Sequence, residues 1–517
     1  MIDTKLLREK ILDLAIRGKL VPQDPNDEPA SVLLKKIREQ KKQMVKEGKL
    51  KAKDIKNDTV IFKGDDNLHY EQFADGTVKC IEDEIPFEVP DGWCWCRLGS
   101  ISAAIQYGLS NSAEQSGTHR LLRITDIQDG KVDWDTVPFT TAYEAGNYLL
   151  SSGDIVFART GATVGKSFLI KELPYPAVYA SYLIRIRLLD GVHPDYIYQF
   201  FSSQCYWEQI TDKSVGVGQP NCNGTSLKEL FIPIPPFSEQ NRIVPSALST
   251  LEYVTNIELD KASLLETVTS IKFKILDLAI QGKLVPQNQD DEPASVLLER
   301  IRAEKEELIK AGKIKRDKKE SVILKGDDNS YYEKVGNEVT CIDGEVLFEI
   351  PQGWCYTRLS SISEIIMGSS PNGTSINRNG NGMEFHQGKI CFTDKIIGHS
   401  ISFTDKSVKL AKENSLLLCV RAPVGEVNIT DRCVCIGRGL AAISPLSKMQ
   451  TEFLFYWLQS FKKVLLQKAT GSTFVAITAD TVKNICIPLP PLEEQNRICK
   501  AIDKIFVVLD IIEQSLN

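Results

Sequence analysis

The stretch "KILDLAIRGKLVPQDPNDEPASVLLKKIRE", residues 10–39, returns almost unchanged as "KILDLAIQGKLVPQNQDDEPASVLLERIRA", residues 274–303. The two copies stand 264 residues apart in a chain of 517. A repeat of this length indicates that one structural unit has been duplicated, so both halves are expected to share one fold.

Three further segments repeat in the same order and extend the duplication over most of the chain. They are "KGDDN" at 63 and 325, "PDGWCWCRL" at 90 with "PQGWCYTRL" at 351, and "IPIPPFSEQNRI" at 232 with "IPLPPLEEQNRI" at 487. Two divergent stretches, about 99–230 and 360–485, lie inside this shared frame. A constant frame with variable inserts predicts one scaffold that presents two different surfaces.

The two ends of the chain continue the repeat, because together they match the uninterrupted segment from Ser238 to Gly282. Residues 238–281 carry apolar side chains at mostly three- and four-residue spacing, which predicts a helix that ends at the glycine. At 1.5 Å per residue, about 40 residues give a rod of roughly 60 Å. The matching helix, 493–517 with about 4–17, would pack against this rod as an antiparallel coiled coil. The alternative is that each helix caps its own domain.

This pattern describes a circular arrangement cut open inside one helix. We therefore expect the termini to lie close together and the two halves to be related by a pseudo-two-fold axis.

The segments between the repeat marks predict mixed structure. Residues 29–50 and 293–312 read as shorter charged helices, each with a proline in its first turn. The stretches 50–62 and 313–322 are polar and are expected to be mobile, whereas the divergent inserts show the short β-branched runs of an α+β domain with long loops. Lysines of the first charged helix form a solvated face or contact phosphate; they are Lys35, Lys36, Lys41, Lys42, Lys46 and Lys49.

The bulk composition is that of a multidomain globular protein, with 42% apolar and 25% charged residues. No run of about 18 apolar residues occurs, so no membrane association and a cytoplasmic location are expected. The 13 cysteines and five histidines show no metal-ligand spacing, and the close pairs Cys94/Cys96 and Cys433/Cys435 are interpreted as buried thiols on strands. A net charge of −6 argues against indiscriminate nucleic-acid binding.

One motif suggests a nucleotide site, and the repeat argues against it. "FARTGATVGKS", residues 157–167, has three residues between Gly161 and Gly165, whereas a phosphate-binding loop needs four. The second copy reads "CVRAPVGEVNI", residues 419–429, with Glu426 in place of the lysine. We align Arg159 with Arg421 and interpret both segments as a strand that projects one guanidinium before a glycine turn.

These frame segments, with "GVGQPNCNGTSLKELFIPIPPFSEQNRI" in the first half and "TGSTFVAITADTVKNICIPLPPLEEQNRI" in the second, resemble the DNA-specificity subunit of a type I restriction-modification system. The resemblance implies an α+β fold with two target-recognition domains, each reading half of a bipartite sequence in double-stranded DNA. It also implies long helices that set the spacing between the half-sites.

The resemblance further implies a non-catalytic chain without a cofactor of its own. Its partners would be two modification (methyltransferase) subunits and restriction (translocase/nuclease) subunits, which handle S-adenosylmethionine, ATP and Mg²⁺. The residues agree, since "IPPF" at 234–237 and "LPPL" at 489–492 lack the polar first residue of the adenine-methyltransferase tetrad. A repeat-built scaffold that binds only proteins remains the alternative.

The expected division of the chain follows the repeat. It comprises an N-terminal helix with a charged insert (1–88), recognition domain 1 (89–237), a central helix (238–282), a second charged insert (283–349, repeating 19–88), recognition domain 2 (350–492) and a C-terminal helix (493–517) that pairs with the central one. Lys and Arg outnumber Asp and Glu by fifteen to nine over 356–486, but number ten against thirteen over 100–230. The second domain is therefore expected to be the more basic one.

Candidate DNA-binding residues are polar side chains on loops, because base edges are read by Arg, Asn and Gln from segments that protrude beyond a rigid core. They are Arg123, Arg159, Thr160, Gln219 and Asn221 in the first domain, and Asn372, Arg378, Arg421, Ser472 and Thr473 in the second. Trp93 and Trp354 are interpreted as packing anchors, not as stacking platforms for bases.

Overall fold

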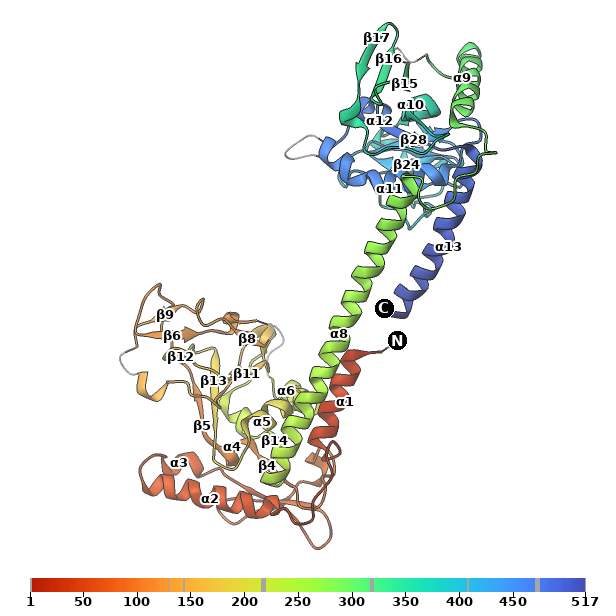
Figure 1. The fold of residues 1–517 in the computed structure, drawn as a ribbon. Helices are drawn as coiled ribbons and strands as arrows, with labels where there is room; N and C mark the ends of the chain where they lie inside the picture. The colour runs from red at the N-terminus through yellow and green to blue at the C-terminus, as the bar shows by residue number, and fades with distance from the viewer. Residues whose placement is uncertain are drawn as a thin grey trace. The chain divides into compact units, whose positions relative to one another are not determined.

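The computed structural model describes residues 2–128, 130–142, 145–214, 220–316, 320–406, 409–469 and 475–516. The chain forms two compact units: a first unit, Ile2–Lys261, and a second unit, Ala262–Asn517. Both units combine helices with several small sheets, which confirms the predicted α+β class (Figure 1).

The elements of the first unit begin with the N-terminal helix. Its helices are α1 (Thr4–Ile16), α2 (Ala30–Lys46), α3 (Ala52–Ile55), α4 (Leu98–Ile101), α5 (Pro194–Phe200), α6 (Gln204–Lys213) and α7 (Gly224–Lys228). Its strands are β1 (Val60–Lys63), β2 (His69–Gln72), β3 (Val78–Cys80), β4 (Cys94–Arg97), β5 (Ser102–Tyr107), β6 (His119–Leu122), β7 (Ile127–Gln128), β8 (Lys131–Val132), β9 (Phe139–Thr140), β10 (Ile155–Ala158), β11 (Ser167–Leu169), β12 (Ala177–Tyr179), β13 (Leu183–Leu188) and β14 (Phe231–Ile234). The long helix α8 (Phe237–Ile280) begins in this unit and ends in the second.

The second unit follows the same order of elements. Its further helices are α9 (Ala294–Lys310), α10 (Leu359–Ile362), α11 (Thr451–Lys468), α12 (Ala479–Lys483) and α13 (Leu492–Leu516). Its strands are β15 (Ser321–Lys325), β16 (Tyr331–Val335), β17 (Glu338–Cys341), β18 (Cys355–Arg358), β19 (Ser363–Met367), β20 (Ile376–Asn377), β21 (Met383–His386), β22 (Phe403–Thr404), β23 (Leu410–Ala411), β24 (Leu416–Cys419), β25 (Val427–Ile429), β26 (Val434–Ile436), β27 (Leu440–Pro445) and β28 (Cys486–Leu489).

A four-stranded antiparallel sheet forms the centre of each variable insert. Its order is β11–β10–β13–β5 in the first unit and β25–β24–β27–β19 in the second, so equivalent strands occupy equivalent places. The central strands β10 and β24 are apolar and buried at every position, as expected for strands covered on both faces. The second sheets differ, with β12–β6–β9 in one unit and the five strands β20–β22–β21–β26–β23 in the other. The divergence of the inserts is therefore concentrated in these second sheets.

The repeated segments form the same buried contact in each unit. The indole Nε1 of Trp93 donates to the Glu239 carboxylate at 2.8 Å, and Trp354 donates to Glu494 at 2.9 Å. Both tryptophans are 5% exposed, which confirms that they are packing anchors. Burial raises the pKa of both carboxyl groups, although each accepts hydrogen bonds from a tryptophan and a glutamine.

The glycine that ends the first repeated helix is required by the same contact. Gly18 has a φ of +65°, and a Cβ there would lie 2.5 Å from Pro90 Cγ. Gly282 has a φ of +67° and faces Pro351 at 2.4 Å. Only a residue without a side chain fits this approach, so the helix end and the Pro-x-Gly-Trp segment are repeated together.

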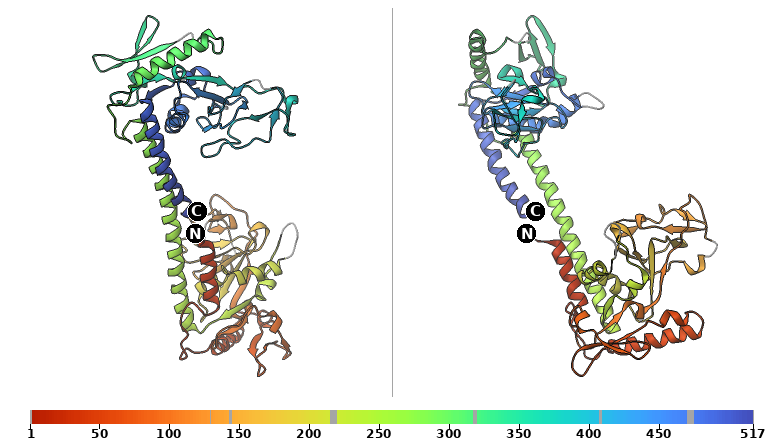
Figure 2. Two further views of the ribbon diagram at one scale, coloured as in Figure 1. Left: turned by 90° about the vertical axis from the view of Figure 1, so that its right-hand side faces the viewer. Right: turned by 180° about the vertical axis from the view of Figure 1, so that it is seen from behind.

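Each unit pairs α8 with a terminal helix (Figure 2). In the first unit, Arg8 of α1 bonds Glu258 at 2.7 Å, while the other end of α1 packs in one apolar cluster with Val244 and Ala247. In the second unit, Lys272 bonds Asp510 of α13 at 2.7 Å. The helix predicted from the apolar spacing is thus present, with antiparallel partners on it. Met1 and Asn517 lie outside the described residues, so the proximity of the termini stays a prediction.

The charged inserts are more ordered than the sequence suggests. The predicted charged helices are present as α2 and α9, but Lys41 is 3% exposed and its ammonium bonds Asp58 at 2.6 Å, so it is not part of a solvated face. The stretch 50–62, expected to be mobile, contains α3 and begins a three-stranded sheet, β1–β2–β3. Within 313–322, β15 begins at Ser321, while residues 317–319 lie outside the described residues. The Lys41–Asp58 ion pair and the pairing of β1 with β2 stabilise these segments, and neither contact can be predicted from the polar composition of the segments.

The structure shows the surroundings of the close cysteine pairs and of one group of residues with metal-binding side chains. Cys96 and Cys435 are buried, but Cys94 is half-buried and Cys433 is exposed, so neither close pair consists of two buried thiols. The described residues bring ligand atoms of His69, Glu82 and Glu88 within 4.8 Å of one another, a grouping that no sequence spacing predicts. The histidine already bonds Glu82 at 2.7 Å, and we assign no metal to this group.

Candidate nucleic-acid interface

The glycine segment 157–167 forms the connection between two antiparallel strands, β10 and β11. Its turn closes where Gly165, at a φ of +91°, donates its backbone N–H to the Ala158 carbonyl at 3.1 Å. A phosphate-binding loop connects a strand to a helix, and this one leads directly into β11 at Ser167. The interpretation of the motif as a turn is confirmed.

Backbone hydrogen bonds join this turn to a segment some sixty residues later in the chain. In the first unit, Gly161 N–H donates to the Pro220 carbonyl at 3.1 Å, and Thr160 pairs with Asn221 as an isolated bridge. In the second unit, Ala422 N–H donates to the Val475 carbonyl, also at 3.1 Å. The turn and the later segment therefore meet at one edge of each sheet, which we call the rim. In the first unit this brings the candidates Thr160 and Asn221 together, and in the second it pairs Arg421 with Ala476.

The rims correct the alignment of the two arginines. In the first unit the backbone carbonyl of Arg159 accepts a hydrogen bond from Cys222 N–H at 3.0 Å. In the second unit the equivalent bond, from Ile477 N–H, is accepted by the carbonyl of Val420 at 2.9 Å. Arg421 thus occupies the place of Thr160, one residue further along. Because side chains alternate along an extended backbone, the two arginines leave the sheet on opposite sides. The predicted equivalence of Arg159 and Arg421 is wrong.

The two arginines also have different surroundings. The guanidinium of Arg159 stacks on the Tyr107 ring, with its carbon 4.9 Å from the ring centre, and its buried Nε has no hydrogen-bond partner among the described residues. Arg421 is exposed. Tyr107 therefore holds the Arg159 side chain in place and leaves its Nε donor without a partner, while Arg421 is directly accessible to a ligand.

The remaining candidates lie in three different situations. Arg123 is bound by Asp126 at 2.6 Å, so its charge is partly neutralised before any ligand arrives. Asn372 and Arg378 are exposed on either side of a short segment that contains β20. Gln219, Ser472 and Thr473 lie outside the described residues.

The structure adds two rim residues that the sequence analysis missed. Tyr182 is 61% exposed, and its carbonyl accepts from Arg159 N–H at 3.1 Å. In the second unit, the Gly439 carbonyl accepts the equivalent bond from Val420, which places the exposed Arg438 beside it. Both residues precede a strand, β13 or β27, whose first four residues are buried, and a large polar side chain one or two residues before such an apolar run is the sequence signal that would have pointed to them.

A charged network supports the second sheet of the second unit. Glu384 on β21 accepts hydrogen bonds from Arg432 at 2.7 Å, His399 at 2.7 Å and His386 at 3.1 Å. Burial by itself raises the pKa of the Glu384 carboxyl, but these hydrogen bonds outweigh burial and lower this pKa to about 2.

Replacing Glu384 by Gln is expected to lower the free energy of unfolding by about 2 kcal/mol at pH 7, since charge-assisted bonds are lost. The folded pKa lies below the ordinary value, so the carboxylate's contribution is present above that value and is lost as pH falls toward 2. Urea unfolding at pH 7 and pH 3 should therefore show a smaller gap between wild type and Glu384→Gln at pH 3. Glu413→Gln, at an exposed position, is the matched control. An equal gap at both pH values would contradict the charge assignment.

The fold and the rims define a class of protein: one scaffold, built twice, that holds two variable polar surfaces for recognition of an extended ligand. The sequence model of the type I restriction modification DNA specificity domain matches residues 108–269 and 351–517. The chain therefore belongs to this family and carries two copies of its domain.

Individual relatives agree with this assignment. The EcoAI specificity subunit of Escherichia coli is 26% identical, with 97% of this chain and 88% of the relative covered. The MjaX specificity subunit of Methanocaldococcus jannaschii, described as putative, is 28% identical over 82% of this chain and 89% of its own length. A chain from a structural study of complex assembly and conformational transition in the type I R-M system superposes with a TM-score of 0.58 at 25% identity, covering 83% of this chain and 94% of that one. The HsdS subunit from Thermoanaerobacter tengcongensis shares the fold at a TM-score of 0.52 and 23% identity, covering 83% and 93%.

Proposed function

We propose that this chain is the DNA-recognition subunit of a type I restriction-modification complex. Each unit reads one half of a bipartite target, and partner subunits carry out adenine methylation and DNA cleavage. The observation that carries the proposal is the pair of rims, in which the same backbone hydrogen bonds hold different exposed side chains. A constant backbone with variable side chains is what two different half-sites require.

The rim residues have the chemistry for reading base edges. Arginine donates two parallel bonds to guanine, and asparagine pairs in the same way with adenine. We assign this reading to Arg421 and Arg438 in the second unit and to Asn221 in the first, where Arg159 on its Tyr107 support and the exposed Tyr182 lie beside it. Gln219, Ser472 and Thr473 stay predictions of the same kind.

The helices offer surfaces for protein partners. In the first unit, Leu6 of α1 is 61% exposed and Tyr253 of α8 is 67% exposed; in the second, Val508 and Ile511 of α13 are 55% and 61% exposed. Large apolar side chains left open on helices favour docking of further helices. Because each unit has such a surface, we propose one modification subunit per unit, joined by restriction subunits.

The cofactors of the reaction belong to these partners. We propose that modification subunits bind S-adenosylmethionine, that restriction subunits bind ATP and Mg²⁺, and that the complex works in the cytoplasm, where its DNA substrate lies. Over the described ranges, none of the helices has the length and hydrophobicity that crossing a bilayer requires.

The rival function is a scaffold that binds only proteins, and selection from random DNA separates the two. We expect the chain, purified with its modification subunits, to enrich two fixed half-sites separated by a constant number of unread base pairs. With labelled S-adenosylmethionine, the complex should methylate the enriched duplex, and the chain alone should transfer no label. Enrichment of no sequence would support the scaffold, and methyl transfer by the chain alone would contradict a non-catalytic role.

A further inference from the structure

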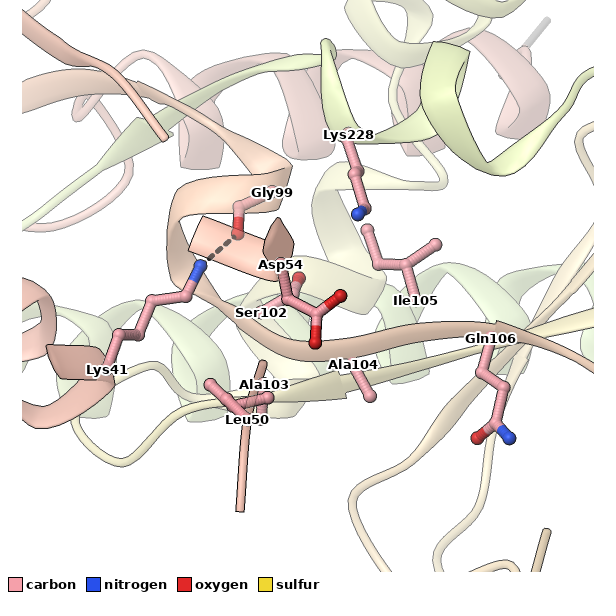
Figure 3. A pocket seen from close by; sticks show the side chains of 10 residues that line it. All are labelled: Lys41, Leu50, Asp54, Gly99, Ser102, Ala103, Ala104, Ile105, Gln106 and Lys228. Atoms are coloured by element: carbon pink, nitrogen blue, oxygen red, sulfur yellow. Dashed lines mark hydrogen bonds between the residues drawn. The ribbon is translucent and has the colours of Figure 1, made fainter. Parts of the chain in front are cut away.

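Each unit contains a cleft at the same place in its fold, between the charged insert and the first strand of the central sheet. In the first unit, this cleft is lined by Lys41, Asp54, Lys228 and residues 102–106 of β5, with a volume of about 240 Å³ (Figure 3). Its charges are balanced locally, because Lys41 bonds both Asp58 and the Gly99 carbonyl, the latter at 2.8 Å.

The cleft of the second unit is larger and carries far more positive charge. Its volume is about 330 Å³, and the lysines that line it are Lys305, Lys313, Lys315, Lys409 and Lys483. One carboxylate, Glu364, also lines it, but this group is already bonded by Lys412. Lys305 is also paired with Glu320 at 3.4 Å, so the unbalanced positive charge lies on Lys313, Lys315 and Lys409. Lysines that share a cleft in this way create a local positive potential.

Four of these five lysines fall into two groups, whereas Lys483 already takes part in another interaction. Lys305 is nearly buried and donates to the Ser360 carbonyl at 3.1 Å, so it is part of the wall, as Lys41 is in the first unit. Lys313, Lys315 and Lys409 are exposed, and no ion pair joins any of these three to another described residue. These three ammonium groups are free to bind an anion.

The lysine cleft is connected to the rim through a few backbone hydrogen bonds. The Lys409 carbonyl accepts from Ile436 N–H at 2.9 Å, and the Ile436 carbonyl accepts from Ser369 N–H at 3.2 Å. Strand β19 runs from Ser363, which lines the cleft, to Met367, and the next residue, Gly368, donates its N–H to the carbonyl of Leu440, beside Gly439 of the rim, at 2.8 Å. Five residues of strand span about 17 Å. A major groove is about 12 Å wide, so a duplex whose bases meet the rim has a backbone within reach of the cleft.

We propose that the lysine cleft of the second unit binds the phosphodiester backbone of duplex DNA beside the half-site that this unit reads. The inference rests on the proposed function, because it assumes that the rim faces a duplex. Lysine binds phosphate as a point charge without demanding a fixed geometry, which suits a backbone contact that carries no sequence information. The cleft of the first unit contains Asp54, and the described residues of that unit form no equivalent backbone site there.

The test compares three variants of the chain in complex with its modification subunits. Lys313→Gln/Lys315→Gln/Lys409→Gln removes the three free charges and leaves Lys305 in the wall. Lys49→Gln/Lys51→Gln changes the residues that match Lys313 and Lys315 in the first copy of the repeat but do not line its cleft. Lys409→Gln alone tests the one of the three exposed lysines that the variable insert contributes. Binding to target and random duplexes is measured over a series of salt concentrations.

Each phosphate contact that is lost should make the slope of log K against log salt less steep by about 1. We expect the triple variant to lose about 3 from the slope and to bind target and random DNA more weakly by the same factor. The single variant should lose about 1, and the Lys49/Lys51 pair should match the wild type. Equal thermal unfolding of all variants would exclude a folding defect.

Three other results would overturn the inference. The triple variant could keep the wild-type slope, the Lys49/Lys51 pair could change it equally, or the triple variant could lose only the binding of inorganic phosphate, measured by calorimetry, with the DNA slope intact. The last result would identify a site for free phosphate. A wild-type complex that binds target and random DNA equally contradicts the proposed function instead, and this outcome is seen before any lysine is changed.

Discussion

Replacing residues 360–485 by the equivalent insert of another family member is expected to change one half of the methylated sequence and to leave the other half and the spacing intact. The ends of this insert meet in space, because Leu359 N–H donates to the Ile485 carbonyl at 2.9 Å. Strands β18 and β28, which pair directly outside these ends, belong to the constant frame. The insert thus leaves and re-enters the frame at one place, although it also contacts α9 and α13 through Ser447–Glu304 and Lys395–Asp503. Exchanging it leaves the Trp354–Glu494 contact in place.

The measurement is a genome-wide map of methylated adenines in cells that carry the exchanged chain. The matched exchange of residues 99–230, whose ends meet through the Leu98–Leu230 hydrogen bond of 2.9 Å, should change only the other half-site. If either exchange altered both halves, each unit could not be reading its half-site independently. If neither altered the sequence, specificity would lie in the frame or in the partners.

The repeat made most of the architecture predictable from the sequence. Two copies of one pattern specify two copies of one fold, and apolar residues at three- and four-residue spacing specify α8 because helical periodicity is a local property. The packing role of Trp93 and Trp354 was also predictable. Their partners, Glu239 and Glu494, were not, since each lies 140 or more residues away in the chain.

Local polarity misled the interpretation of the charged inserts. Lys41 sits in a helix full of lysines, and only the fold reveals that Asp58 and the Gly99 carbonyl cover its ammonium. The segment around Val60 is polar on average, yet it pairs with β2 and becomes a strand. Both errors have one cause: where the sequence of a segment has no strong preference for one structure, tertiary contacts decide the structure.

The candidate site was predictable only in outline. Sequence comparison of the halves located the loops, but it aligned Arg159 with Arg421 because identical letters stood near one glycine. Hydrogen bonds across the sheet align Arg159 with Val420, so Arg421 stands one position later in the repeat than Arg159 does. Its side chain therefore projects from the opposite face of its sheet. The lysine cleft was not predicted from the sequence, because its lysines come from three segments of the chain that reach from Lys305 to Lys483.

Lengthening α8 is expected to change the number of unread base pairs without changing the bases that are read. We consider one heptad inserted between Lys261 and Ala262, where one compact unit gives way to the other, with a second heptad added at the C-terminal end of α13. Seven residues turn the helix through nearly two full turns, so the apolar stripe stays on the same face. They add about 10 Å, roughly three base-pair steps of 3.4 Å.

The spacer between the half-sites should therefore grow by about three base pairs, as read from methylated adenines genome-wide. Three base pairs also rotate the duplex by about a third of a turn, so we expect slower methylation alongside the longer spacing. A seven-residue Gly/Ser insertion at the same position is the matched control, since a flexible chain of equal length transmits no fixed distance and should give no single new spacing. Unchanged spacing with the helical insertion would mean that partner subunits, and not α8, set the distance. A change in the half-site bases would mean that the long helix takes part in reading them.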